Sequence, residues 1–138
     1  MKLYYSAAYT SRREHGNAVR QAVDRLRCLG IDVFAPWLLA EPEDAPHDRA
    51  EYARRMTLLD LAAMSLCHVF VEDRRWGQSR HGSMHYERGR AVGMGLRVIV
   101  IGKQESIFDF DHAMTFVESE DALENLLVEA SSAAAPQT

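Results

Sequence analysis

Short segments rich in β-forming residues alternate along this chain with longer segments of helical periodicity, and this alternation restricts the possible folds. The β-rich segments are residues 2–8, 31–35, 67–71, 96–101 and 113–117. Apolar residues recur at helical spacing between them, and hairpin signals are lacking. Strands that alternate with helices form parallel sheets. The sequence therefore predicts a doubly wound α/β domain with about five strands.

Four segments between or after these strands are predicted to be helices with one apolar face. The first is capped by Ser11 and ended by Gly30, and the second spans residues 51–66. The third runs from a cap at Ser83 to about Gly93, and the last follows Ser119. The expected inward residues of the first helix are Val19, Ala22, Val23, Leu26 and Leu29, and those of the second are Tyr52, Met56, Leu59, Ala63 and Leu66.

The 138-residue chain is long enough to bury one core and shows no internal repeat. We expect one domain over residues 1–130 and a disordered tail over residues 131–138. The net charge of −4 gives no general attraction for a nucleic acid polymer or an anionic membrane. No apolar run approaches the ~20 residues that span a bilayer. Two cysteines and the lack of a signal-peptide layout favour a cytoplasmic protein.

Polar loops follow the predicted strands at residues 6–12, 36–50, 72–83 and 102–112. The carboxyl ends of parallel strands meet at one edge of a sheet, where ligands bind near the switch in strand order. The sequence therefore predicts a ligand site that these loops surround. Trp37, in the second of them, could stack on a base or cover the core.

Glu87 is the first candidate for chemistry, because it lies on an otherwise apolar stripe of its predicted helix with Met84, Ala91 and Met94. Burial would raise its pKa, and a helix N-terminus would lower it. The alternative is an acidic residue that merely favours the first turns of a helix. Asp60 is the second candidate, and paired carboxylates suit glycosidic chemistry. Its alternative is an exposed helix carboxylate.

The segment after the first strand could bind an anion. Strand alternation places Tyr4 and Ser6 on one face, and Arg12 and Arg13 follow at a helix N-terminus. The alternative is that the tyrosine packs in the core and the arginines are solvated. His81 and His85 have the i, i+4 spacing of metal ligands, but Gly82 and Ser83 place the helix start between them, so we expect no metal.

The run Glu87-Arg88-Gly89-Arg90-Ala91 is followed by a glycine-containing turn and an apolar strand. It resembles the Glu-x-Gly-x-Ala motif of the nucleoside 2-deoxyribosyltransferase family, whose superfamily includes the 2′-deoxynucleoside 5′-phosphate N-hydrolases. The resemblance covers most of residues 1–128 in order. Asp60-Leu61 is similar to the family's second carboxylate, and residues 3–7 are similar to its first strand.

The resemblance implies a flavodoxin-like fold and cleavage or transfer at the N-glycosidic bond of a (2′-deoxy)nucleoside or its 5′-monophosphate, without a cofactor. Glu87 is implied to be the nucleophile on C1′, and Asp60 to assist the leaving base or orient the sugar. Tyr4 is implied to hold Glu87 or the sugar. Active sites in the family are commonly completed by a neighbouring subunit, which implies a homodimer or larger assembly, with Ser106 as a candidate cross-subunit contact.

The chain departs from the family pattern at several positions. Ser6 stands in a loop where the family often has glycine, and Arg88 follows the nucleophile position where Phe or Leu is typical. Arg80 or His81 replaces an acidic residue of some transferases, and a basic residue at this position favours a substrate that carries a phosphate. The loop that ends with Gly82 and Ser83 is then expected to bind this phosphate together with Arg12 and Arg13.

Two other functions are compatible with the same residues. One is a non-catalytic nucleotide-binding or sensor module, because a fold does not fix a function. The other is an NAD-cleaving glycohydrolase that uses a single Glu and does not need Asp60.

Overall fold

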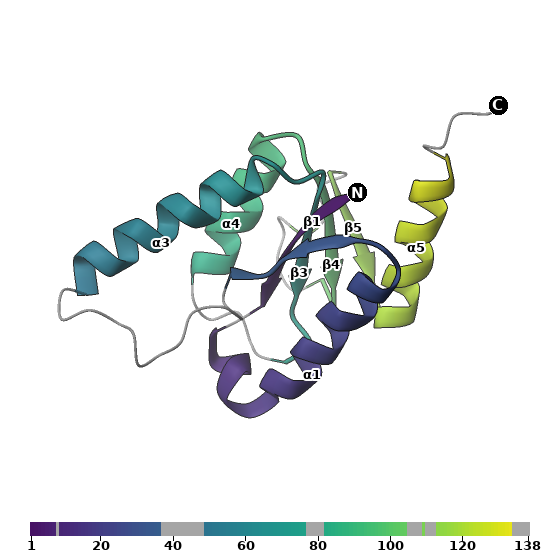
Figure 1. Ribbon diagram of the computed structural model, residues 1–138, viewed down its shortest axis with the longest axis horizontal. Helices are drawn as coiled ribbons and strands as arrows, with labels where there is room; N and C mark the ends of the chain where they lie inside the picture. The colour runs from purple at the N-terminus through teal and green to yellow at the C-terminus, as the bar shows by residue number, and fades with distance from the viewer. Residues whose placement is uncertain (8, 37–48, 77–81, 105–108, 110–112, 134–138) are drawn as a thin grey trace.

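The computed structural model describes residues 1–7, 9–36, 49–76, 82–104, 109 and 113–133. The strands are β1 (Lys2–Ala7), β2 (Asp32–Phe34), β3 (Val69–Asp73), β4 (Arg97–Ile101) and β5 (Met114–Val117). The helices are α1 (Tyr9–Cys28), α3 (Arg49–Met64), α4 (Gly82–Gly93) and α5 (Glu120–Ala133). All strand pairs are parallel, in the order β2-β1-β3-β4-β5 (Figure 1). This is the flavodoxin-like order, so the predicted doubly wound fold is confirmed.

Strand alternation divides the core into two layers, one on each face of the sheet. Leu3 and Tyr5 of β1 point to one face, where they pack with α1 and α5. Tyr4 points to the other face, with Phe70 of β3 and Met64 of α3. Figure 1 shows α1 and α5 on one side of the sheet and α3 and α4 on the other. The site described below lies on the α3 and α4 side.

Helix α1 begins earlier than predicted. It starts at Tyr9 and is kinked at His15, where φ is −132° and ψ is 18°, so the proposed cap Ser11 lies inside the helix. Its apolar face is buried as predicted, except that Leu29 is exposed because it lies in the turn after the helix. Gly30 adopts a φ of +77° in that turn, which glycine accommodates without strain.

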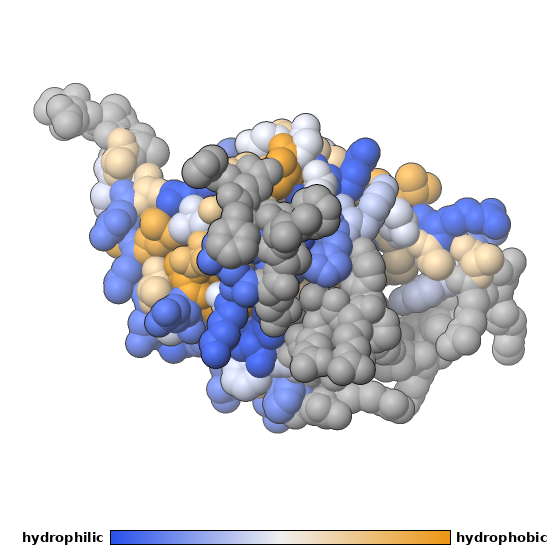
Figure 2. Space-filling model, turned by 180° about the vertical axis from the view of Figure 1, so that it is seen from behind, coloured by the Kyte–Doolittle hydropathy of each residue, from blue (hydrophilic) through white to orange (hydrophobic). Residues whose placement is uncertain are grey.

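Helix α3 packs less of its surface than its periodicity predicted. Leu59, expected to face inward, is exposed, and Leu58 is 69% exposed. Leu66, also expected to face inward, is exposed in the turn after the helix, which ends at Met64. Met64, in the last turn of this helix, is fully buried. The reason is visible in Figure 1, where α3 extends past the sheet, so its outer part has no strand to pack on. Figure 2 shows apolar and charged side chains mixed along this projecting helix.

Two boundaries also differ from prediction. Strand β3 runs from Val69 to Asp73, so Glu72 and Asp73, assigned above to a loop, are paired with β1 and β4. Helix α5 continues to Ala133, so residues 131–133 are helical rather than part of a disordered tail. The hydroxyls of Ser131 and Ser132 donate to carbonyls one turn earlier, which satisfies them within the helix. No helix among the described residues is both long and apolar enough to cross a membrane.

Candidate active site

Glu87 and Ser6 meet at the carboxyl end of β1. The Ser6 hydroxyl donates a hydrogen bond of 2.6 Å to Glu87 Oε2. Ser6 is buried at the end of β1, and Glu87 is half-buried on α4 between the buried side chains of Met84 and Ala91. The predicted apolar stripe around Glu87 is therefore present, although Met94 at its far end is partly exposed. The pair lies where the strand order reverses between β1 and β3, at the switch point of the sheet.

The pKa of Glu87 is raised to about 7, and burial is the main cause. The hydrogen bond from Ser6 lowers the pKa, while the negative charges of Asp60 and Glu72 raise it further. Burial disfavours the ionised carboxylate because it loses hydration, whereas a donated hydrogen bond favours it. Near neutral pH, Glu87 therefore exists in both protonation states, which suits a group that must act as an anion at one step of a reaction.

Asp60 approaches this site from α3. Its negative charge raises the pKa of both Glu87 and Tyr4, which places the three side chains near one another. Burial raises the pKa of Asp60 itself to about 6. Its Oδ1 atom is buried, and no described residue forms a hydrogen bond with it. A carboxyl group without a donor is more easily protonated, because nothing compensates the ionised form for its lost hydration.

Tyr4 lies on the same face of β1 as Ser6 and is buried. Its ring stacks on Phe70 with ring centroids 5.6 Å apart and also contacts Phe34. Burial and the nearby carboxylates of Glu87 and Asp60 raise its pKa above the usual value, so the hydroxyl stays protonated at neutral pH. The packing role that the sequence left open is thus present, and the phenol is also close to both acids.

The other predicted site residues are only partly described. Arg12 and Arg13 lie in the first turns of α1, directly after β1. Gly82 and Ser83 form the start of α4, which begins at Gly82, so Ser83 is not its cap. Trp37, Arg80 and Ser106 lie outside the described residues. Among the residues that the structure does describe, no three His, Cys, Asp or Glu side chains form a group that could hold a metal ion.

Sequence reasoning missed a second group of charged residues next to Glu87, which we name the buried ion quartet. It consists of Glu72 at the end of β3, Arg74 just after β3, Arg88 on α4 and Asp109 after β4. Their side chains are at most 7% exposed. One sequence feature could have indicated this group. Glu72 is two residues after buried Phe70 and therefore points to the same face of the sheet.

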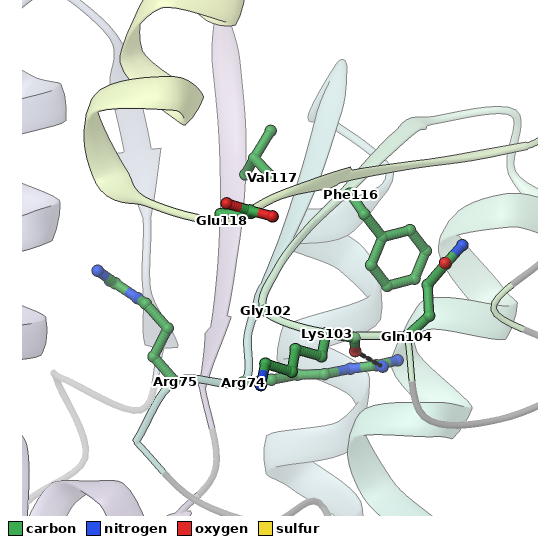
Figure 3. Close-up of a pocket in the computed structure, with 8 residues that line it drawn as sticks. All are labelled: Arg74, Arg75, Gly102, Lys103, Gln104, Phe116, Val117 and Glu118. Carbon is green, nitrogen blue, oxygen red and sulfur yellow. Dashed lines mark hydrogen bonds between the residues drawn. The ribbon is translucent and has the colours of Figure 1, made fainter.

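A cavity of about 780 Å³ opens at the carboxyl ends of β3, β4 and β5. It is lined by Arg74, Arg75, Gly102, Lys103, Gln104, Phe116, Val117 and Glu118. Figure 3 shows the Arg74 side chain running beneath Lys103, whose carbonyl accepts a hydrogen bond of 3.2 Å from Arg74. The cavity adjoins the buried ion quartet through Arg74, but Glu87 and Ser6 are not among its described lining residues.

Comparison with known proteins finds no matching family model and no matching curated protein. Solved structures do match. The 2-deoxyribosyltransferase from Bacillus psychrosaccharolyticus aligns with a TM-score of 0.71 and 20% identity, covering 91% of each chain. The fold of this chain is that of the nucleoside 2-deoxyribosyltransferase-like proteins.

Two further structures with this fold extend the comparison. The CMP N-glycosidase BcmB from Clostridium botulinum aligns with a TM-score of 0.63 and 16% identity, covering 94% of this chain and 99% of its own. A conserved protein from Enterococcus faecalis V583 aligns with a TM-score of 0.71 and 16% identity, covering 94% of this chain and 98% of its own. At these identities the likeness establishes the deoxyribosyltransferase-like fold, and the chemistry is argued from this chain's own residues.

Proposed function

We propose that this protein cleaves or transfers the N-glycosidic bond of a 2′-deoxynucleoside or its 5′-monophosphate, with Glu87 as the nucleophile. The observation that carries the proposal is the half-buried Glu87 carboxylate, oriented by Ser6 at 2.6 Å beside a second carboxyl group with a raised pKa. Solved proteins with the same fold include a CMP N-glycosidase and a 2-deoxyribosyltransferase.

In the first step, ionised Glu87 attacks C1′ of the sugar as the C1′–N bond breaks. The electron pair of that bond leaves with the base, and protonated Asp60 supplies the proton that the departing base takes up. The products are a free base and a sugar joined to Glu87 through an ester. In the second step, water or an acceptor base attacks C1′, Glu87 leaves as the carboxylate, and Asp60 receives the proton.

This mechanism requires one proton on the carboxyl pair. With pKa values of about 6 for Asp60 and about 7 for Glu87, the pair carries two protons at low pH and none at high pH. Because the two groups interact, the intermediate form shares its single proton between them. The reactive species has the proton on Asp60 and the charge on Glu87. It is the less populated of the two singly protonated forms, because Glu87 has the higher pKa, and the activity is predicted to be greatest between these two values.

The first turns of α1 are the proposed site for a 5′-phosphate. They follow β1 directly, carry Arg12 and Arg13, and include no acidic residue in the first turn. Free backbone N–H groups at a helix N-terminus and neighbouring cations both favour an anion. We therefore propose that the monophosphate is preferred over the nucleoside.

A second copy of the chain is proposed to cover the face formed by α3 and α4. Leu58 and Leu66, near or on α3, are 69% and 66% exposed, and Tyr86 of α4 is 55% exposed. Large apolar side chains gathered on one side of a molecule are typical of protein interfaces. Since Asp60 and Glu87 lie on these helices, such a partner would border the catalytic pair.

The test is chromatographic detection of free base from deoxy- and ribonucleosides and their 5′-monophosphates, with and without an acceptor base. Wild type is predicted to release or exchange a base, while Glu87→Gln does not. Exposed Glu129→Gln is the matched control and is predicted to retain activity. Binding of a nucleotide by folded wild-type protein, without base release from any member of the panel, would contradict the proposal.

A further inference from the structure

The buried ion quartet forms a closed ring of ion pairs. Arg74 Nε lies 2.7 Å from Glu72 Oε1, and its two Nη atoms lie 2.9 and 3.0 Å from the two carboxylate oxygens of Asp109. Arg88 Nη1 completes the ring, 3.3 Å from Glu72 Oε2 and 3.1 Å from Asp109 Oδ1. Two guanidinium groups and two carboxylates give the ring a formal charge of zero.

Stability alone does not account for such a ring. Each buried charge loses its hydration, and apolar side chains of similar volume often hold a fold equally well or better. The ring joins three different parts of the site edge, namely β3 with the residue after it, helix α4 and the segment after β4. A neutral, fully paired ring of this kind instead fixes the relative positions of the elements that carry it.

Two members of the ring are direct neighbours of the Ser6–Glu87 hydrogen bond. Arg88 follows Glu87 in α4, so its ion pairs restrain the helical turn that presents the carboxylate. Glu72 is the register partner of Ser6 across the β1–β3 pair, so it restrains the strand beside the donor. The ring thus holds the backbone on both sides of this one hydrogen bond.

We propose that the buried ion quartet is a positioning device for Glu87, in which Arg88 and Glu72 hold the carboxylate against Ser6 and fix the electrostatic potential that it experiences. The proposal rests on the function proposed for Glu87. Arg88 and Glu72 are positioning residues, because they act through Glu87 rather than on the substrate.

The titratable and charged groups near Glu87 come from four elements. Neutral Tyr4 lies on β1, Asp60 on α3 and Glu72 on β3, while Arg88, the next residue of α4, contacts His85 one turn earlier. Loss of Arg88 changes the ring from neutral to −1, and loss of the Glu72 carboxylate changes it to +1. The two changes therefore act on ionised Glu87 with opposite signs.

The test is a direct titration of Glu87 by nuclear magnetic resonance of the carboxyl carbons in the full-length protein, with the Glu87 signal assigned by its loss in Glu87→Gln. Glu72→Gln is predicted to lower the pKa of Glu87 by about one pH unit, and Arg88→Met to raise it by a similar amount. The double variant Glu72→Gln/Arg88→Met keeps the ring neutral and is predicted to titrate near wild type.

Controls separate positioning from simple damage to the fold. Arg90→Met removes an exposed cation from the same helix and is predicted to leave the titration unchanged. Arg88→Lys keeps the charge and is predicted to restore the wild-type pKa. Asp109→Asn is the second variant if a change at Glu72 or Arg88 prevents folding, and it is predicted to lower the pKa of Glu87.

The proposal also predicts different effects of these substitutions on kcat and on KM. Arg88→Met is predicted to reduce kcat about tenfold with little change in KM, because in this proposal Arg88 acts through Glu87 rather than on the substrate. Unchanged or same-direction titration of Glu87 in folded Glu72→Gln and Arg88→Met proteins would overturn the proposal. Since the titration needs no substrate, it decides this inference even if wild type releases no base, an outcome that would overturn only the proposed function.

Discussion

Ser6 and Glu87 are separated by 81 positions in the sequence, yet the serine hydroxyl donates a 2.6 Å hydrogen bond to the glutamate carboxylate. The bond links the end of β1 to the second turn of α4, across the switch point of the sheet. It lowers the pKa of Glu87, whereas burial and the neighbouring acids Asp60 and Glu72 raise it. The serine therefore orients the proposed nucleophile and favours its reactive, ionised form.

Removing this donor tests its role. Ser6→Ala is predicted to raise the pKa of Glu87 further and to reduce kcat by about 10- to 100-fold, the range expected for a hydrogen bond to a charged group. Ser65→Ala is the matched control, because Ser65 is exposed in the turn after α3 and its hydroxyl donates to the Ala62 carbonyl. The measurement is the pH dependence of base release. Equal profiles for wild type and Ser6→Ala would contradict the orienting role.

Asp60 is predicted to control the alkaline side of the pH profile. Wild type needs one proton on the carboxyl pair, so kcat/KM should fall on both sides of an optimum between about pH 6 and 7. Asp60→Asn removes the proton donor and the negative charge beside Glu87. Its profile should lose the alkaline limb and keep an acidic limb set by the ionisation of Glu87, and its maximum should fall about 10²- to 10⁴-fold. A two-sided profile in Asp60→Asn would exclude Asp60 as the acid.

Glu87 is also predicted to reduce stability at high pH. Its folded-state pKa of about 7 lies above the ordinary value of 4.5, so protonation favours the folded state and this contribution is lost as the pH rises through 7. Glu87→Gln cannot ionise. Its free energy of unfolding should equal that of wild type below about pH 4.5. Above pH 7 it should exceed the wild-type value by about 2–3 kcal/mol, as measured by denaturant unfolding.

The control for this stability prediction is Glu129→Gln, which changes an exposed glutamate on α5 and should show no such pH-dependent difference. If the stability of Glu87→Gln relative to wild type does not increase between pH 5 and 8, burial does not disfavour the ionised Glu87 carboxylate.

The apolar surface of α3 predicts self-association. Leu58→Asp and Leu66→Asp should reduce the mass measured by light scattering from a dimer or larger to a single chain, because each puts a charge into the proposed interface. Val128→Asp, an exposed apolar position on α5, is the control and should leave the assembly intact. A wild-type protein that is monomeric at assay concentration and fully active would rule out a shared site.

The fold could be predicted because each strand and helix carries its own local signal. The five β-rich segments and the apolar face of α1 depend only on periodicity, and parallel pairing follows from the alternation of strands and helices. Glu87, Asp60 and Tyr4 could be brought together because the resemblance assigned them to one site. The topology then placed their elements at one edge of the sheet.

The buried ion quartet could not be predicted in the same way. In the sequence, Arg74 and Asp109 look like ordinary loop charges, and only tertiary packing buries them as partners 35 positions apart. Arg88 was noted as a departure from the apolar residue typical of the family, but its ion pairs with Glu72 and Asp109 depend on where α4 docks. The exposure of α3 was missed because periodicity does not reveal how far a helix extends past the sheet.

The most direct test of the central claim is to trap the covalent intermediate on Glu87. Wild-type protein is mixed with a 2′-fluorinated analogue of the preferred substrate, which slows turnover by disfavouring the oxocarbenium-like transition state, and is then denatured in acid and analysed by mass spectrometry. We expect a mass increase equal to one sugar or sugar phosphate, located on the peptide that contains Glu87 and absent from Glu87→Gln. Release of base without any such adduct, or an adduct on another residue, would contradict it.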